Sequence, residues 1–262
     1  GNKEIAIITH KIVSPTTKKV LDDFVSKYPS AKIYSYEQFD NSVRNSAWKK
    51  CYGTGEFPAI KWSEAKVILS LDGDFLGESK NKVENARLFS EGRDVVNKNF
   101  NRLYVIEGNM TITGMAADYR MRLRPDVQLN FILSLVDALN KKGAGIPITV
   151  GGYTFDNLSK QFGLNIETLN TLVSDLLKNK GNSIIYAGDH LPEDVQIAVN
   201  MMNKVLGNES LYNFESAPVS VLPLSTSEEI NNLVTRMNTG EVAAAIHLNS
   251  NPVYHLPADL RY

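Results

Sequence analysis

Acidic residues and glycines directly follow a predicted strand at residues 66–71. Asp72, Gly73 and Asp74 stand where a dinucleotide-binding fold places its phosphate loop, and Gly77 follows three residues after Asp74. Such a loop needs small residues and free backbone amides that face the phosphates. The two carboxylates would repel a phosphate at short range, so we favour a tight acidic turn over a nucleotide loop. Paired carboxylates could also bind a cation, but further ligands are not evident nearby.

A second acidic turn follows the predicted strand at residues 102–106. Glu107 is the first residue of this turn and Asn109 is the third. An acid at such a strand end can hold a ribose hydroxyl, but a lone acid there is more often solvent-exposed. Arg120, Arg122 and Arg124 then alternate along the chain, so they share one side if this stretch is extended. They could form an anion site, but we favour the interpretation that they pair with nearby Asp and Glu side chains.

Histidine and cysteine offer no complete metal or nucleophile pattern. The four histidines are far apart, although His10 and His190 both follow predicted strands and could converge at one crevice. The single cysteine excludes an internal disulfide, a Cys₄ zinc site and an iron–sulfur site built by this chain. Cys51 follows Lys49 and Lys50 and could be a reactive thiol, but a structural role is favoured. We therefore predict no catalytic residue and no metal ligand here.

Strands alternate with helices along the chain, which predicts an α/β fold with parallel sheets. Helix starts are indicated by Ser14 before Pro15 and by a capping-box pattern from Thr226 to Glu229. Residues 41–61 show weak periodicity and are predicted to be a loop or linker. In such folds ligands bind at the carboxyl ends of the strands, where the two acidic turns lie. The other strands are predicted at 4–9, 32–36, 183–186 and 242–248.

Composition narrows the classes of partner. The 262 residues suffice for one large domain or two smaller ones. Lys and Arg number 28 against 29 Asp and Glu, so nucleic acid is not an expected partner. No apolar run approaches the roughly 20 residues that cross a bilayer, so no direct membrane span is expected. The start and end of the sequence lead us to expect a piece of a longer protein.

Four segments, taken in order, resemble the molybdopterin oxidoreductase superfamily. Three stretches resemble a narrower group within it. They are DGDFLG at 72–77, MTITGMAADYR at 110–120 and NPVYHLPADL at 251–260. This group is the molybdopterin-like part of the iron–sulfur subunit of bacterial alternative complex III, a quinol-oxidising membrane complex. The four segments that resemble the superfamily are 65–76, 103–125, 182–208 and 241–257.

The resemblance implies a fold, an organisation and a role. It implies two Rossmann-like parallel-sheet lobes, similar to domains II and III of formate dehydrogenase and DMSO reductase. Residues 1–58 and 180–262 would form the first lobe, and 59–179 the inserted second lobe. The implied role is a non-catalytic scaffold segment of a respiratory electron-transfer subunit on the periplasmic side of the inner membrane. Its implied partners are other subunits of the complex and a downstream domain that carries the iron–sulfur clusters.

Three segments depart from the superfamily pattern in the direction of less phosphate binding. Asp72-Gly73-Asp74-Phe75 replaces Gly-Ala-Asn-Pro, and Glu107-Gly108-Asn109 replaces Asp-Pro-Arg. Arg124-Pro125 is kept, but Asp126 follows it. Each lost charge-assisted contact costs on the order of 1.5–3 kcal/mol, so we expect no bound molybdopterin. The residues of this vestigial cleft are Asp72, Gly73, Asp74, Glu107, Asn109, Arg124, Asp126 and Gly188.

Two alternatives stay open. The chain could be the cofactor-binding portion of an active molybdopterin-dependent oxidoreductase, with Cys51 as the metal ligand. It could also be a small-molecule binding module that uses a crevice between the lobes.

Overall fold

The computed structural model describes residues 3–37, 41–53, 56–79, 81–96, 98–215 and 222–262, which form two compact units. The first unit comprises Gly1–Asp40 and Val219–Tyr262, and the second comprises Asn41–Pro218. These boundaries differ from the predicted ones, because β9 (Ser183–Ala187) pairs with β4 (Val67–Leu71). Residues 180–218 therefore belong with the inserted unit. Hydropathy marks β9 as a strand but does not say which strand it joins.

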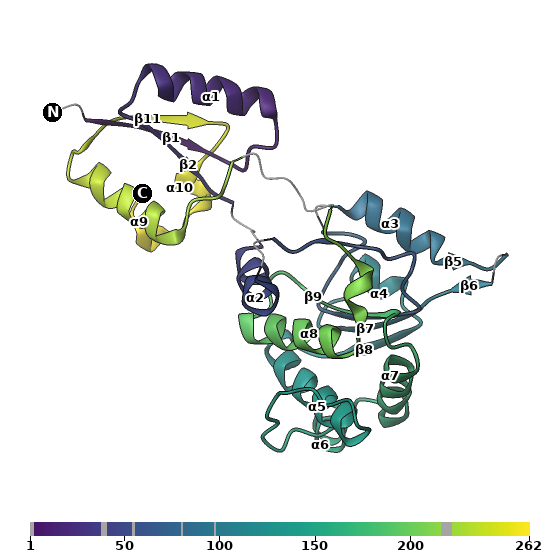
Figure 1. Cartoon of the computed structure of the whole chain (residues 1–262). Helices are drawn as coiled ribbons and strands as arrows, with labels where there is room; N and C mark the ends of the chain where they lie inside the picture. Colours follow the sequence, from purple (N-terminus) through teal and green to yellow (C-terminus); the bar gives the residue numbers. More distant parts are fainter. Residues whose placement is uncertain (1–2, 38–40, 54–55, 80, 97, 216–221) are drawn as a thin grey trace. The chain divides into compact units, whose positions relative to one another are not determined.

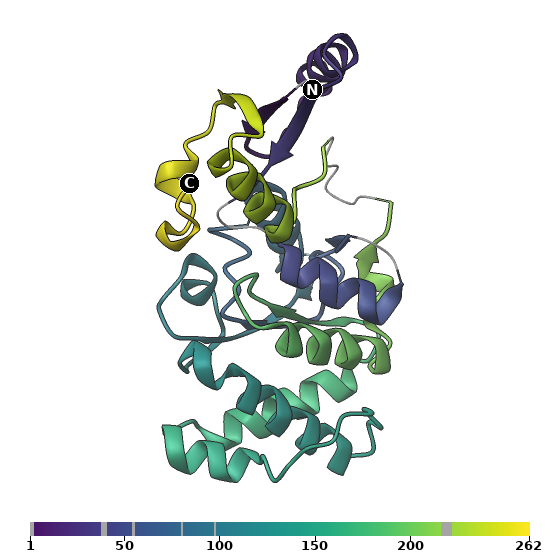
Figure 2. The ribbon, with the colours of Figure 1, turned by 90° about the vertical axis from the view of Figure 1, so that its left-hand side faces the viewer.

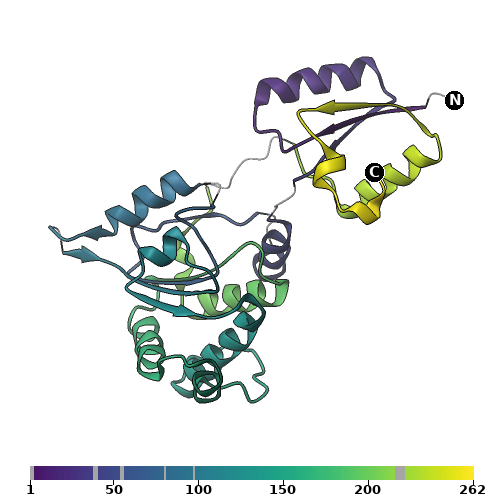
Figure 3. The same ribbon diagram turned by 180° about the vertical axis from the view of Figure 1, so that it is seen from behind.

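The first unit is a three-stranded parallel sheet in the order β11-β1-β2. Its strands are β1 (Glu4–Thr9), β2 (Ala31–Ser35) and β11 (Val242–Leu248). Helices α1 (Pro15–Lys27) and α9 (Ser227–Asn238) lie on opposite faces of this sheet (Figure 1, Figure 3). Both predicted starts are confirmed, because Ser14 caps α1 and Thr226 forms a capping box with Glu229. The short helix α10 (Pro252–His255) follows β11.

A buried carboxylate joins the strands of the first unit to α9. Glu4 accepts hydrogen bonds from the Tyr34 hydroxyl at 2.7 Å and the Arg236 guanidinium at 2.9 Å. Its carboxylate also lies 3.1 Å from Nζ of Lys32. Burial opposes ionisation, but the bonds from Tyr34, Arg236 and Lys32 outweigh it and lower the pKa of Glu4 below 4.5. Burial and the bond to Glu4 raise the pKa of Tyr34 to about 12.

We expect Glu4→Gln to destabilise the first unit at neutral pH but not in acid. A carboxylate whose pKa is lowered by folding stabilises the protein above its unfolded-state pKa, and this contribution disappears as the pH falls through the folded-state pKa. The stability gap between wild type and variant should therefore close progressively below pH 4.5. Urea unfolding at several pH values measures the gap, with Glu64→Gln in an exposed turn as control. A gap that is constant with pH would contradict the assigned role of Glu4.

The second unit contains a four-stranded parallel sheet in the order β8-β7-β4-β9. The chain goes from β4 through α3 (Lys82–Glu91) to β7 (Arg102–Glu107), and through α4 (Ile112–Met115) to β8 (Tyr119–Arg122). It then crosses to the other side of β4 to form β9. The carboxyl ends of β4 and β9 are therefore the point where the strand order reverses, which is where such sheets bind ligands. Two small antiparallel pairs complete the unit: β3 (Ala59–Ile60) with β10 (Tyr212–Asn213), and β5 (Arg93–Asp94) with β6 (Asn99–Phe100).

Each face of this sheet has its own core. One face packs against α5 (Gln128–Lys141), α6 (Phe155–Phe162), α7 (Ile166–Lys178) and α8 (Glu193–Val205). The other face is aromatic: Trp62 stacks on Phe75 at a ring distance of 4.0 Å, and Tyr186 meets Trp62 edge-on. Figure 1 shows α5, α6 and α7 gathered on one side of the sheet and α3 on the other. The α/β class with parallel, helix-covered sheets is thus confirmed. No helix in the described ranges is long and apolar enough to cross a membrane.

The predicted loop at 41–61 is wrong over half its length, because residues Ser42–Tyr52 form helix α2. This helix packs against α8, and Figure 2 shows the two side by side. It buries Arg44, Ala47 and Trp48 although its sequence has no continuous apolar stripe. Trp48 meets the Tyr212 ring of β10 edge-on, with the ring centres 4.9 Å apart. Helix α2 is therefore held by these tertiary contacts, which local periodicity does not report.

The outer edge of β9 is closed by a side chain. Asn203 of α8 accepts from the Ile185 amide at 3.0 Å and donates to the Ile185 carbonyl at 2.8 Å. Its Nδ2 also donates to the Tyr212 hydroxyl at 3.0 Å, and its Oδ1 also accepts from the side-chain amide of Asn208 at 3.1 Å. The carboxamide thus makes the two bonds that a neighbouring strand would make.

Candidate functional site

The carboxyl ends of β4, β7 and β9 bring together the acidic turns predicted from the sequence. The Gly188 amide donates to the Leu71 carbonyl, and the Asp72 amide donates to the Ile106 carbonyl, each at 2.8 Å. The three strand ends are therefore joined by the residues that follow them. We call Asp72, Asp74, Glu107 and Gly188, with their hydrogen-bond partners, the strand-end cluster.

Asp72 joins the ends of β4 and β7 through its carboxylate, and its carbonyl packs closely against Gly188 at the end of β9. Oδ1 accepts from the Gly108 amide at 2.9 Å, and Oδ2 accepts from Nε2 of Gln128 at 2.8 Å. Its φ of +44° lies in the left-handed region, which only glycine enters without cost. A Cβ added to Gly188 would lie 2.1 Å from the Asp72 carbonyl oxygen. Gly188 is therefore required by the close approach of two chain segments.

Asp74 closes its own turn and caps α4. Its Oδ1 accepts from the Thr113 amide at 2.9 Å, the Thr113 hydroxyl at 2.7 Å and the Gly77 amide at 3.1 Å. Gly73 lies under the Tyr186 ring, which would be 2.6 Å from an added Cβ. The prediction of a tight acidic turn is therefore confirmed. Thr113, which no sequence pattern singled out, is the residue that holds the turn.

Glu107 is buried and not solvent-exposed, and its partners are half-buried. Its carboxylate is 1% exposed and pairs with Nε of Arg120 at 2.5 Å. It also accepts from the Thr111 hydroxyl at 2.7 Å. Arg124 and Asp126 form a separate exposed pair, with Nη2 and Oδ2 at 2.7 Å. The predicted pairing of the arginines with nearby acids is confirmed for Arg120 and Arg124. Arg122 and Asn109 are exposed.

A buried arginine that the sequence analysis missed lies at the end of β9. Arg44 of α2 donates to the Tyr186 hydroxyl at 2.9 Å and to the Ala187 carbonyl, and it lies 2.9 Å from a carboxylate oxygen of Asp189. Its guanidinium sits 4.4 Å from the Tyr186 ring centre. Burial raises the pKa of the Tyr186 hydroxyl, so this hydroxyl stays protonated. Arg44 could be found only by recognising α2, which has no amphipathic signature.

The histidines predicted to converge belong to different units. His10 packs in the first unit, where its ring lies 5.0 Å from that of His255 and 4.9 Å from that of Tyr36. His190 follows β9 in the second unit. In the part of the chain that the structure describes, no three His, Cys, Asp or Glu side chains form a group that could hold a metal.

Cys51 lies on α2 with Sγ 4.0 Å from the Ile197 carbonyl. Burial raises the pKa of its thiol, and the charge of Lys204 only partly offsets this. We expect iodoacetamide at pH 8 to alkylate Cys51 roughly ten-fold more slowly in the folded protein than in urea, because only the thiolate reacts. Lys204→Met should slow the reaction further. Equal rates in folded and unfolded protein would contradict a shielded thiol.

The strand-end cluster does not fit the phosphates of a dinucleotide. Such phosphates need free amide donors and cations. Here the Gly108, Thr113 and Gly77 amides already donate to Asp72 and Asp74. Arg120, the cation nearest Glu107, is used by that carboxylate. The side-chain carboxylates occupy the donors that an anionic ligand would use.

Comparison with known proteins supports the fold alone. No protein-family model matches the sequence, and no curated protein matches it. Among solved structures, acetylene hydratase from Pelobacter acetylenicus is similar, with a TM-score of 0.52 and 12% sequence identity. The similarity covers 77% of this chain and 29% of that enzyme's chain. The chain therefore spans less than a third of the length of this structural relative.

Proposed function

We propose that this chain is a non-catalytic, molybdopterin-enzyme-like scaffold segment of a respiratory electron-transfer subunit, without bound molybdopterin. The observation that carries the proposal is that backbone amides in the strand-end cluster already donate to side-chain carboxylates. A fold that binds dinucleotides leaves these amides free, whereas here Asp72 and Asp74 accept from three of them. A bound phosphate would have to displace each carboxylate and then lie beside it, which is unfavourable at short range.

The position in a respiratory complex rests on the sequence resemblance. Under this proposal the partners are other subunits of a quinol-oxidising membrane complex and a downstream domain with iron–sulfur clusters. The location is the periplasmic side of the bacterial inner membrane. Co-purification of the chain with such a complex, from a host that makes both, tests this placement.

The main test measures metal and pterin in the chain purified from a host that makes molybdopterin. We expect substoichiometric molybdenum and tungsten by mass spectrometry and no pterin fluorescence after oxidation. Stoichiometric metal or pterin would overturn the proposal. It would favour the second candidate, the cofactor-binding portion of an active molybdopterin-dependent oxidoreductase, which rests on the same sequence resemblance.

A substitution tests the physical reason directly. Asp72→Gly removes the carboxylate that accepts from Gly108 and suits the positive φ at this position. We expect inorganic pyrophosphate at millimolar concentration to shift the Gly108 amide resonance in the variant but not in the wild type. Asp126→Gly in the exposed pair with Arg124 is the control and should leave the Gly108 response unchanged. A wild-type shift as large as that of the variant would show that the carboxylate does not block the amide.

A further inference from the structure

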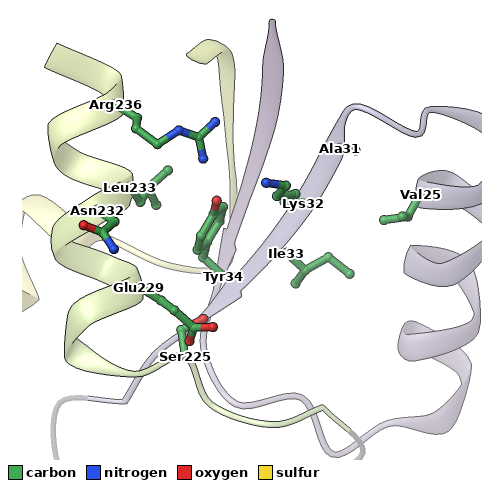
Figure 4. Close-up of a pocket in the computed structure, with 10 residues that line it drawn as sticks. All are labelled: Val25, Ala31, Lys32, Ile33, Tyr34, Ser225, Glu229, Asn232, Leu233 and Arg236. Atoms are coloured by element: carbon green, nitrogen blue, oxygen red, sulfur yellow. The ribbon is translucent and has the colours of Figure 1, made fainter. Parts of the chain in front are cut away.

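The hollow beside β2 in the first unit offers no unpaired charge to a ligand. It has a volume of about 470 Å³, and its charged lining residues are Lys32, Glu229 and Arg236 (Figure 4). Lys32 and Arg236 both pair with Glu4, and Glu229 is used in the capping box. A buried polar group without a partner is a stronger indication of a site, and the second unit has one beside its single cysteine.

Nδ2 of Asn200 is a buried donor without an acceptor. Asn200 lies on α8 and is 2% exposed, and in the described part of the chain no atom accepts a hydrogen bond from this nitrogen. A donor that has lost its bonds to water destabilises the fold unless an acceptor comes within reach.

The nitrogen faces the sulfur of Cys51, across the contact between α2 and α8. Sγ of Cys51 lies 4.0 Å from the Ile197 carbonyl, and Asn200 follows Ile197 by one turn of α8. The Tyr52 hydroxyl donates to the Asn200 carbonyl at 3.4 Å, which holds the next residue of α2 at the same turn. Burial raises the pKa of the Cys51 thiol, whereas the Lys204 charge and the contact with Asn200 favour the thiolate. Asn200 therefore points a donor at a sulfur, which is a weak acceptor.

We propose that Cys51 is a site of oxidation to sulfenic acid by hydrogen peroxide, with Nδ2 of Asn200 as the donor to the new oxygen. The oxygen added to Sγ is a better acceptor than the sulfur and gives this donor a partner. In the reaction the thiolate attacks one oxygen of the peroxide, so that an S–O bond forms while the O–O bond breaks. The sulfur loses two electrons and the peroxide gains them. The departing hydroxide takes up the proton that the thiol released to solvent, and it leaves as water.

Two features retain the product at this stage. The chain has a single cysteine, so no second thiol of the same chain can convert the sulfenic acid to a disulfide. Cys51 is half-buried between α2 and α8, which limits access by larger thiols. The same burial keeps the thiol protonated, so the oxidation is slow. The site therefore works by holding its product and not by reacting fast.

Mass spectrometry of the full chain gives the first test. Millimolar hydrogen peroxide, removed with catalase after several hours, should leave one oxygen on Cys51 in the folded protein. Dimedone added in urea should then label Cys51, because this reagent reacts with sulfenic acid and not with thiols or methionine sulfoxide. Cys51→Ser, treated in the same way, should gain no dimedone and corrects for oxidation of the six methionines. A Cys51 that stays unoxidised, or passes directly to sulfinic acid, would overturn the proposal.

A substitution tests the role of Asn200. Oxidation should raise the unfolding equilibrium constant less than about three-fold in the wild type, because the oxygen has a donor. In Asn200→Leu, which keeps the side-chain size, the oxygen has no donor and the rise should be at least about ten-fold. Thermal unfolding of oxidised and reduced samples measures both changes, and Cys51→Ser again corrects for methionine oxidation. Equal changes in the two proteins would remove Asn200 from the site and contradict the proposal.

Nuclear magnetic resonance of the wild type decides the matter if Asn200→Leu does not fold. Oxidation should shift the side-chain amide protons of Asn200 downfield. It should leave unchanged those of Asn203, which already donate to Ile185 and Tyr212. An unchanged Asn200 signal in the oxidised protein would show that the sulfenic oxygen does not accept from this side chain.

Discussion

Replacing Asn203 by leucine is expected to lower the free energy of unfolding by about 3–5 kcal/mol. The substitution keeps the size of the side chain but removes every hydrogen bond that the carboxamide makes. Four buried groups would each lose a hydrogen-bond partner. They are the backbone amide and carbonyl of Ile185, the Tyr212 hydroxyl and the side-chain amide of Asn208. Each unpaired buried group costs about 1–3 kcal/mol, and partial rearrangement keeps the total below the full sum.

Asn200→Leu is the matched control for this prediction. Asn200 lies one turn earlier on α8 and is equally buried, but its amide nitrogen has no partner in the described structure. We therefore expect a change within about 1 kcal/mol, in either direction. Urea unfolding of the three proteins measures the difference. Similar losses in both variants would show that shape on α8, rather than closure of the β9 edge, determines the stability.

Replacing Gly188 by alanine is expected to cost about 3 kcal/mol or more. The added Cβ would lie 2.1 Å from the Asp72 carbonyl oxygen and 2.9 Å from Cε1 of His190. The histidine ring can turn away, but the Asp72 carbonyl belongs to the backbone between strand β4 and its acidic turn. Relief of the overlap therefore has to move the ends of β4 and β9 apart.

Gly151→Ala is the control for the glycine substitution. An added Cβ at Gly151 meets no atom within 4 Å, and this glycine does not have a positive φ. Alanine there should leave stability unchanged or raise it by up to about 1 kcal/mol, because it restricts the unfolded chain. Thermal unfolding of both variants distinguishes the positions. If Gly188→Ala unfolds like Gly151→Ala, the contact between the ends of β4 and β9 is not rigid.

The Gly188 result also bears on the proposed function. A glycine at the end of a parallel strand can serve the approach of a phosphate to the backbone. Here the space over Gly188 is already taken by the Asp72 carbonyl and the His190 ring. Gly188 therefore joins two strand ends, as the carboxylate of Asp72 does through Gly108 and Gln128. Both residues of the predicted vestigial cleft therefore have a structural role of their own.

The sequence by itself determined the features that depend on near neighbours. The buried strands, the cap at Ser14 and the capping box at Thr226 each follow from residues only a few positions apart, and the structure has them where they were predicted. The acidic turn at Asp72–Asp74 was also predicted, because two carboxylates so close in sequence disfavour a phosphate wherever the strand goes.

Only the tertiary structure decided which groups those residues meet. Helix α2 exists because Trp48 and Arg44 find buried partners, among them Tyr186 and Ala187, more than a hundred residues later. The partner of β9, and with it the division into units, depends on a pairing with β4 that hydropathy cannot specify. Asp72 meets Gly108 and Gln128 only after three strands have aligned. Hydrogen bonds between residues far apart in sequence form only once the fold has brought their segments together. The local spacing of residues does not predict which segments meet.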